Sequence, residues 1–214
     1  MSARDAILAQ LSRATPATLR PAAVAPAPVN GGSAVKIRRF AAGLQAASAT
    51  FAVVSGPAAV PGAIAAYLAA NSLPLRICPG EVPAAVDLRN AAQLEYGADR
   101  LPDDGGTLVT GCLAALAEEG VVVLASGTRQ VAADAFLAAT HIVIVESGQL
   151  LDGMDDLWPV LRQGPLPRSL HLIRGPSRTA DLGVPSRLGA HGPLRVHVIL
   201  VEPAYVECAD PGDT

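Results

Sequence analysis

The chain has 214 residues, of which 50% are hydrophobic, 16% are charged and only 3% are aromatic, and its formal net charge is -3. This length favours one α/β domain with a single core. The weakly negative charge and the lack of a basic run argue against a nucleic-acid surface and against a polybasic membrane anchor.

The apolar runs of the sequence are short. The longest, FAVVS, VVVLAS, IVIVES and RVHVILV, all fall well below the roughly 20 residues that cross a bilayer. The first residues, MSARDAILAQLSRA, carry charges at helical spacing and differ from the pattern of a signal peptide. We therefore expect a cytoplasmic protein with no membrane span.

The N-terminal region predicts a helix followed by an extended arm. Ile7, Leu8 and Leu11 form an apolar stripe in a helix over residues 4–13. The next segment, TPATLRPAAVAPAPVNGGS, contains four prolines and two glycines and has no periodicity. We therefore separate residues 1–33 from a main domain over residues 34–206 and a C-terminal tail over residues 207–214.

Helices and strands alternate in the first half of the main domain. Ser33 is a candidate N-cap for a helix that extends to about Ser48, and TFAVVS is predicted to follow as a short buried strand. A second helix is predicted over residues 61–70 and a second strand over residues 75–78. This order is typical of a parallel sheet that is covered on both faces.

The second half contains most of the predicted strands. They are TLVTG, VVVLAS, THIVIVES, SLHLIRG and RVHVILV, and an amphipathic helix is predicted over residues 150–162. The periodicity leaves open whether residues 112–117 form a helix or a strand. The predicted fold class is α/β, with an open, largely parallel central sheet flanked by helices.

The segment GPSRTAD directly follows a predicted strand, and it is a candidate anion-binding loop. Ligands of open α/β sheets bind beyond the carboxyl ends of strands. Gly175 permits a tight turn, Ser177 and Thr179 offer hydroxyl groups, and Arg178 offers a forked donor that matches carboxylate or phosphate. In the alternative interpretation, Ser177 or Thr179 caps a turn and Asp181 pairs with Arg178 to stabilise the loop.

Two further residues are candidates for proton transfer or nucleophilic attack. His191, in the turn AHGP, has an imidazole suited to general acid or base catalysis, although a histidine in such a turn also serves structure alone. Glu118 lies with Glu119 at a predicted turn between two apolar runs. Its carboxylate is either a nucleophile or base, or a solvated turn charge.

The cysteines and the other histidines do not have the spacing of a metal site. Cys78, Cys112 and Cys208 are far apart and too few for a four-thiolate cluster, which is typical of reduced, buried thiols. The remaining histidines, which are His141, His171 and His197, share no close ligand spacing. We therefore expect no metal and no cofactor in this chain.

The pair of segments GPSRTADL and GAHGPLRVHVILV resembles the C-terminal signature of the lactate-utilisation protein C family, the LUD domain. LAEEGVVVL and THIVIVES are similar to two further segments of that family, so the resemblance extends over about residues 34–203. The matching positions are Glu118, Gly120, Gly175, Pro176, Ser177, Arg178, Thr179, Asp181, His191, Gly192 and Pro193. Where the family has threonines after its glutamate, this chain has Glu119 and Val121.

The resemblance implies a fold like that of the NagB, ribose-5-phosphate isomerase and CoA-transferase superfamily. It also implies a role in the oxidation of L-lactate to pyruvate, with iron–sulfur clusters in partner proteins and none in this chain. The loop from Gly175 to Asp181 and Gly192 would then bind a small anionic ligand or a partner.

Two other functions remain open. One is a free-standing enzyme of the CoA-transferase or sugar-phosphate isomerase type that uses Glu118, in analogy to the Glu-x-Gly turn of CoA transferases. The other is a non-catalytic scaffold in which residues 1–33 dock on partner proteins.

Overall fold

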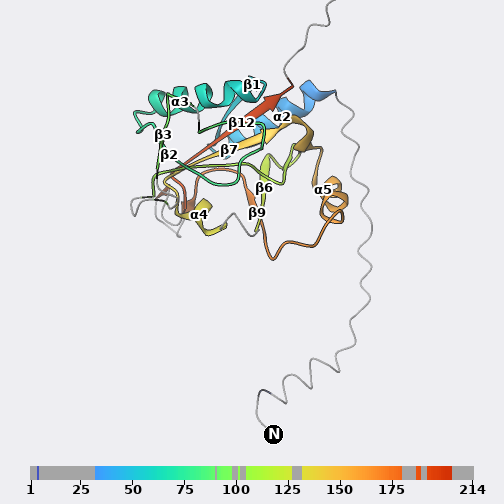
Figure 1. Cartoon of the computed structure of the whole chain (residues 1–214). Helices are drawn as coiled ribbons and strands as arrows, with labels where there is room; N and C mark the ends of the chain where they lie inside the picture. The colour runs from blue at the N-terminus through green and yellow to red at the C-terminus, as the bar shows by residue number, and fades with distance from the viewer. Residues whose placement is uncertain are drawn as a thin grey trace, which may run out of the picture.

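A six-stranded parallel sheet forms the centre of the molecule (Figure 1). The computed structural model describes residues 4, 32–89, 91–97, 101, 105–126, 132–179, 187, 188 and 192–203. The strand order is β1-β12-β7-β4-β2-β3. The strands are β1 (Thr50–Ser55), β2 (Arg76–Pro79), β3 (Glu95–Tyr96), β4 (Thr107–Thr110), β7 (Thr140–Glu146) and β12 (Arg195–Glu202). Every pair in this sheet is parallel, so the predicted fold class is confirmed.

A second sheet packs against the first, and the alternation of helices and strands did not predict it. Its order is β8-β5-β6-β9, and β6 pairs antiparallel with both β5 and β9. The strands are β5 (Ala114–Leu116), β6 (Val121–Ala125), β8 (Leu150–Leu151) and β9 (Leu170–Ile173), and a separate small hairpin joins β10 (Arg178–Thr179) to β11 (Arg187–Leu188). The undecided segment 112–117 therefore contains a strand.

Four helices and two short 3-10 helices complete the described part of the chain. They are α2 (Ser33–Ala46), α3 (Val60–Ala70), α4 (Ala132–Leu137), α5 (Met154–Leu161), η1 (Pro57–Ala59) and η2 (Ser147–Gln149). Most of the predicted helix over residues 4–13, the arm and the C-terminal tail lie outside the described residues. No helix in the described ranges is long and apolar enough to cross a membrane.

The two faces of the central sheet are covered differently. On one face, Ile64 and Leu68 of α3 pack against Ile142 of β7 and Ile199 of β12. The other face carries Val143 and Val198, together with the inner side chains of α2, α4 and the second sheet. This second core includes Phe40, Leu44, Ala115, Val122, Leu124, Ala135 and Ile173. The burial of this apolar surface from water is the main force that holds the layers together.

Helix α5 covers the outer face of the second sheet. Leu157 and Leu161, which are four residues apart, pack against Leu116 and Val123. The predicted helix over residues 150–162 is therefore too long at its start. Leu150 and Leu151 pair with β5 instead, because this pairing buries Leu150 in the core between the sheets.

Two other local predictions are wrong. Ser33 is the first residue of α2 and not its cap, because Gly32 occupies the cap position with no side-chain hydrogen bond. The strand β1 is not buried: it lies at the edge of the sheet, and Val53 is 44% exposed. A run of apolar residues is therefore compatible with an edge strand as well as with a central one.

Candidate functional site

The loop after β9 is fixed to the end of helix α2. A Cβ atom added to Gly175 would lie 2.4 Å from the carbonyl oxygen of Ala47, which is closer than real Cβ contacts. The nitrogen Nε of Arg174 donates to the carbonyl of Gly43 at 3.4 Å. Gly175 is therefore required by a close approach between two backbones.

Arg178 extends from this loop toward the turn between α2 and β1. Its guanidinium donates a hydrogen bond to the hydroxyl of Ser48. Ser48 has a φ of 68°, in the left-handed region that few non-glycine residues adopt. The cationic group thus lies on the surface with a neutral partner, which leaves its charge uncompensated by this contact.

The two segments of the C-terminal signature meet in space. The backbone nitrogen of Ser177 donates to the carbonyl of Pro193 at 2.9 Å. A Cβ atom on Gly192 would lie 2.9 Å from the Cβ atom of Ser177. The segments GPSR and GP, separated in the sequence, therefore form one surface feature, which we call the signature loop (residues 174–179 with 192 and 193).

Some predicted members of this site lie outside the described residues. These are Asp181 and His191. Thr179 belongs to the backbone of β10, next to Arg178. The predicted roles of these residues in catalysis or ligand binding stay predictions.

The signature loop lies at the amino ends of parallel strands. Ser48 precedes β1, Pro193 precedes β12, and the nitrogen of Leu194 donates to the carbonyl of Ala139 just before β7. The prediction had used the carboxyl-end rule of open parallel sheets. That premise is wrong here, because β9 belongs to the second sheet and pairs antiparallel with β6.

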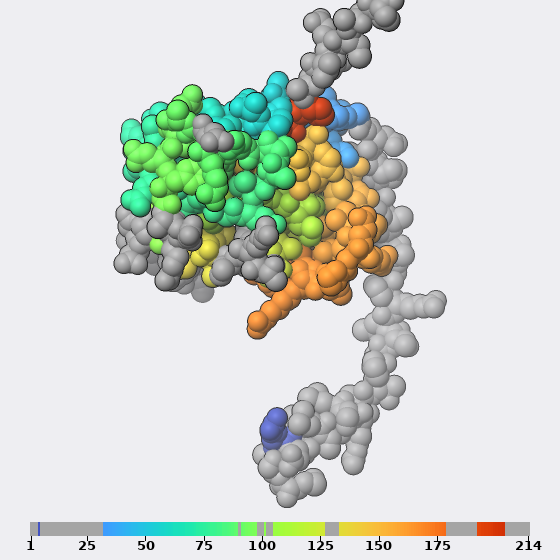
Figure 2. Space-filling model, viewed as in Figure 1, coloured from blue at the N-terminus to red at the C-terminus, as the bar shows by residue number. Residues whose placement is uncertain are grey.

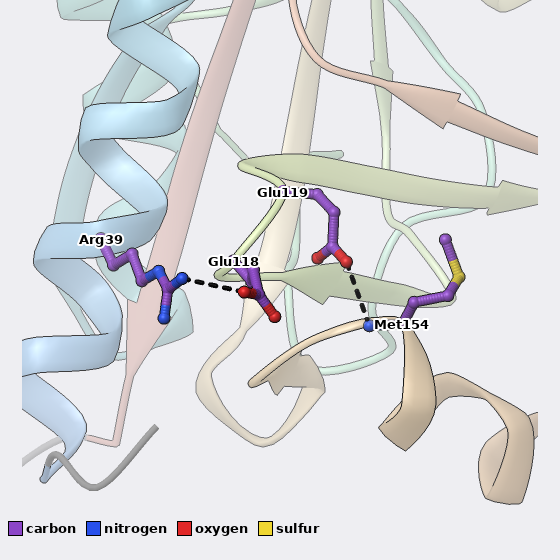
Figure 3. A network of polar contacts seen from close by, with 4 residues as sticks. All are labelled: Arg39, Glu118, Glu119 and Met154. Carbon is purple, nitrogen blue, oxygen red and sulfur yellow. Dashed lines mark hydrogen bonds and ion pairs between the residues drawn. The ribbon is translucent and has the colours of Figure 1, made fainter. Parts of the chain in front are cut away.

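Glu118 lies at the turn between β5 and β6 (Figure 3). Its Oε1 atom accepts a hydrogen bond from Arg39 of α2 at 3.0 Å, and 45% of its side chain is exposed. Arg39 and Ala47 are separated by eight residues, or about 12 Å along a helix axis. Among the described hydrogen bonds and ion pairs, none joins Glu118 to Arg178, although Arg174 of the signature loop and Gly120 of the turn both contact Gly43.

Glu119 has a different role at the same turn. Its Oε1 atom accepts a hydrogen bond from the backbone nitrogen of Met154, the first residue of α5, at 3.2 Å. Figure 3 shows the two glutamates directed toward different elements, Glu118 toward α2 and Glu119 toward α5. A carboxylate at this place satisfies a free helix N–H group and interacts favourably with the helix dipole.

Glycine fixes the position of this turn. Gly120 has a φ of 62°, and a Cβ atom on it would lie 2.5 Å from the Cα atom of Gly43. The match of Gly120 to the family pattern is therefore explained by backbone packing.

Each of the three described histidines contacts a hydroxyl group. His141 Nε2 lies 2.9 Å from Thr110, His197 Nδ1 lies 2.7 Å from Thr50, and His171 Nε2 lies 3.0 Å from Ser169. Burial lowers the pKa of both His141 and His197 to about 4, so both are neutral at pH 7. Among the described residues, no group of three or more His, Cys, Asp or Glu side chains is placed to hold a metal ion.

Two cysteines lie in the described residues, and both favour structural roles. Burial raises the pKa of the Cys112 thiol to about 12 and raises that of Cys78 above its ordinary value. Both are therefore protonated at pH 7 and poorly nucleophilic. Cys208 lies outside the described residues.

The structure also brings together residues that the sequence analysis did not single out. Tyr67 of α3 stacks on the ring of His197, with centroids 4.0 Å apart. A groove beyond β2 and β3 includes Asp87, Arg89 and Tyr96. Its only signal in the sequence is CPGEVP, a loop with Pro and Gly after a strand.

Comparison with known families identifies the part of the chain that holds both candidate sites. The family model of the LUD domain matches residues 105–201, a range that includes Glu118 and the signature loop. The chain is therefore similar to the LUD domain over these residues. The resemblance to the lactate-utilisation protein C family is thereby confirmed.

The chain is also similar to curated proteins named Lactate utilization protein C. It is similar to Lactate utilization protein C of Geobacillus kaustophilus, with 35% identity over 91 residues, and to that of Bacillus subtilis, with 33% identity over 91 residues. Each match covers 40% of this chain and 38% of the relative. The chain thus spans about two fifths of the length of the curated relatives that it matches.

A solved structure shares the fold. It is a DUF162 family protein from Deinococcus radiodurans, with a TM-score of 0.58 and 24% sequence identity. The match covers 80% of this chain and 99% of that protein. At this identity the similarity shows the fold alone. The domain boundaries at residues 33 and 206 stay predictions.

Proposed function

We propose that this chain is a LUD-domain component of an L-lactate utilisation system, in which L-lactate is oxidised to pyruvate. The observation that carries the proposal is the LUD match over residues 105–201, together with relatives named Lactate utilization protein C. In this proposal, iron–sulfur partner proteins carry the electrons, and this chain contributes no redox centre. The site of action is the cytoplasm.

The signature loop is the proposed contact of this component with a small anion or a partner. Ser177 and Pro193 hold its two segments together, and Gly175 fixes it on α2. Arg178 is exposed, and its guanidinium contacts a neutral hydroxyl group rather than a carboxylate. A carboxylate or phosphate would exchange this contact for a stronger, charge-assisted pair.

Growth on L-lactate tests this proposal. The gene is deleted in the strain that carries it, and the strain is complemented with the wild type, Arg178→Ala or the control Arg162→Ala. Arg162 is also an exposed arginine, but it follows α5, away from the loop. We expect the deletion and Arg178→Ala to slow growth on L-lactate and Arg162→Ala to leave it unchanged.

Two results would contradict the proposal. Normal growth of the deletion strain on L-lactate would remove the chain from lactate utilisation. Full complementation by Arg178→Ala, at equal protein levels, would remove the signature loop from this role. Growth on glucose serves as the control for general fitness.

The alternative function is a free-standing enzyme of the NagB, ribose-5-phosphate isomerase and CoA-transferase type. It is favoured by the half-exposed carboxylate of Glu118, which Arg39 holds in a fixed position. This alternative requires activity of the purified chain toward CoA esters or sugar phosphates without any partner. A Glu118→Gln variant that retains such activity would count against it.

A further inference from the structure

The central sheet reverses its strand order between β2 and β4. From β2 the chain passes outward to β3, whereas from β4 it passes to β7 on the other side. Val86 and Leu88, in the first connection, join the core on the α3 face, and Val122 and Leu124, in the second, join the core on the α2 face. Two connections that diverge in this way leave a crevice beyond the carboxyl ends of the strands, where ligands of open α/β sheets bind.

A groove of about 600 Å³ lies beyond the carboxyl ends of β2 and β3, on the β2 side of this point, and its lining comes from the connection between these two strands and from Tyr96. Two backbone hydrogen bonds connect the segment after β2 with β4 and the residue that follows it. The nitrogen of Gly80 donates to the carbonyl of Val109 at 2.8 Å, and the nitrogen of Gly111 donates to the carbonyl of Glu81 at 2.7 Å. In Figure 2, the segment after β2 (green) lies on the left of the molecule, and the α5 region (orange) lies on the right. The volume lies in the usual range for small-molecule sites. We call it the switch-point groove.

The lining of the groove combines carboxylates with flat side chains. Glu81 and Asp87 are exposed acidic residues, and the Arg89 guanidinium carbon lies 5.6 Å from the centre of the Tyr96 ring. Ionised carboxylates only accept hydrogen bonds, so they suit ligand hydroxyl groups. Among the lining residues that the structure describes, two carboxylates and one guanidinium leave a net charge of -1, which disfavours a polyanionic ligand.

We propose that the switch-point groove binds a neutral ring compound that carries a vicinal diol and has the size of a nucleoside. Glu81 and Asp87 accept hydrogen bonds from the diol, and Arg89 and Tyr96 contact the flat ring. This proposal goes beyond the role in lactate utilisation and is independent of it. A nucleoside and a free sugar share the diol chemistry, and the test distinguishes them.

Calorimetric titration of the full chain tests the proposal with adenosine, 2′-deoxyadenosine, AMP and glucose. We expect saturable binding of adenosine, about tenfold weaker binding of 2′-deoxyadenosine, which lacks the diol, and weaker binding of AMP, whose phosphate the carboxylates repel. Tighter binding of glucose than of adenosine would support the diol contacts of Glu81 and Asp87 and would overturn the contact of a flat ring with Arg89 and Tyr96.

Variants locate the binding in the groove. We expect Asp87→Asn and Glu81→Gln each to weaken binding about tenfold, and Glu95→Gln, an exposed carboxylate of β3 outside the groove, to leave it unchanged. All three side chains are exposed, so we expect the variants to fold like the wild type. Equal melting temperatures of the variants and the wild type check this. The proposal is overturned if neither adenosine nor glucose binds up to its solubility limit, if AMP binds tighter than adenosine, or if both groove variants bind like the wild type.

Discussion

The signature loop and the β5–β6 turn are both anchored to α2 through a glycine, but they place their charged residues differently. Gly175 packs on Ala47 and Gly120 packs on Gly43. In the signature loop, the guanidinium of Arg178 contacts only a neutral hydroxyl group among the hydrogen bonds described. At the turn, the charge of Glu118 is paired with Arg39. Equivalent backbone anchoring therefore produces one cationic group whose described partner is a neutral hydroxyl group and one carboxylate that is paired with a guanidinium.

The largest expected effect on stability comes from a substitution at Gly120, which packs the β5–β6 turn against α2. Gly120→Ala places a Cβ atom 2.5 Å from the Cα atom of Gly43 at a φ of 62°. We expect the free energy of unfolding to fall by about 4 kcal/mol, because backbone overlap and a left-handed residue add their costs. Urea denaturation measures this loss. Gly164→Ala is the control, because nothing lies within 4 Å of a Cβ atom there.

A second effect concerns the pH dependence of stability at His197, in the strand that follows the signature loop. His197 lies beside Thr50 at the start of β1, near the signature loop, and its pKa is about 4 in the folded protein, against an ordinary value of 6.5. Between pH 6.5 and pH 4 the unfolded chain binds the additional proton. This histidine therefore lowers the stability by up to about 3 kcal/mol as the pH falls through that window.

Denaturation curves of variants at a series of pH values check this sign. His197→Gln is expected to reduce the decrease in stability between pH 6.5 and pH 4, and the decrease that remains includes the contribution of His141, whose pKa burial also lowers to about 4. An unaltered slope in His197→Gln would show that the imidazole of His197 does not titrate on unfolding.

A smaller effect is expected at the anchor of the signature loop. Gly175→Ala brings a Cβ atom to 2.4 Å from the Ala47 oxygen, and we expect the free energy of unfolding to fall by about 2 kcal/mol. The loss is smaller than for Gly120→Ala because the φ of Gly175 is not in the left-handed region. A greater fall in the free energy of unfolding for Gly175→Ala than for Gly120→Ala would contradict this prediction.

The smallest effect concerns the ion pair at the turn. Arg39 and Glu118 are 41% and 45% exposed, so solvent screens their attraction. A double-mutant cycle with Arg39→Gln and Glu118→Gln is expected to give a coupling energy of about 0.5 kcal/mol in thermal denaturation. A coupling several times larger would show that this pair stabilises the contact between α2 and the turn.

Much of the fold followed from local patterns. THIVIVES and RVHVILV are continuous apolar runs, which predict buried parallel strands, and β7 and β12 occupy the middle of the central sheet. The family resemblance likewise depended on short segments of adjacent residues. Both kinds of signal are readable because the information lies within about ten residues of chain.

Other features depended on contacts between distant segments. The run TFAVVS did not reveal that β1 is an edge strand, and SLHLIRG did not reveal that β9 belongs to the second sheet. Periodicity reports the burial of a strand but not its pairing partner, which is decided by backbone hydrogen bonds to remote residues.

By itself, the sequence determined an α/β chain with a LUD-type signature and the positions of most of its strands. Only the tertiary structure decided that Ser177 meets Pro193, that Glu118 pairs with Arg39, and that a groove opens beyond β2. The physical reason is that local propensity and apolar patterning act along the chain, whereas strand order and the packing of backbone on glycine are set by the assembly of the whole core.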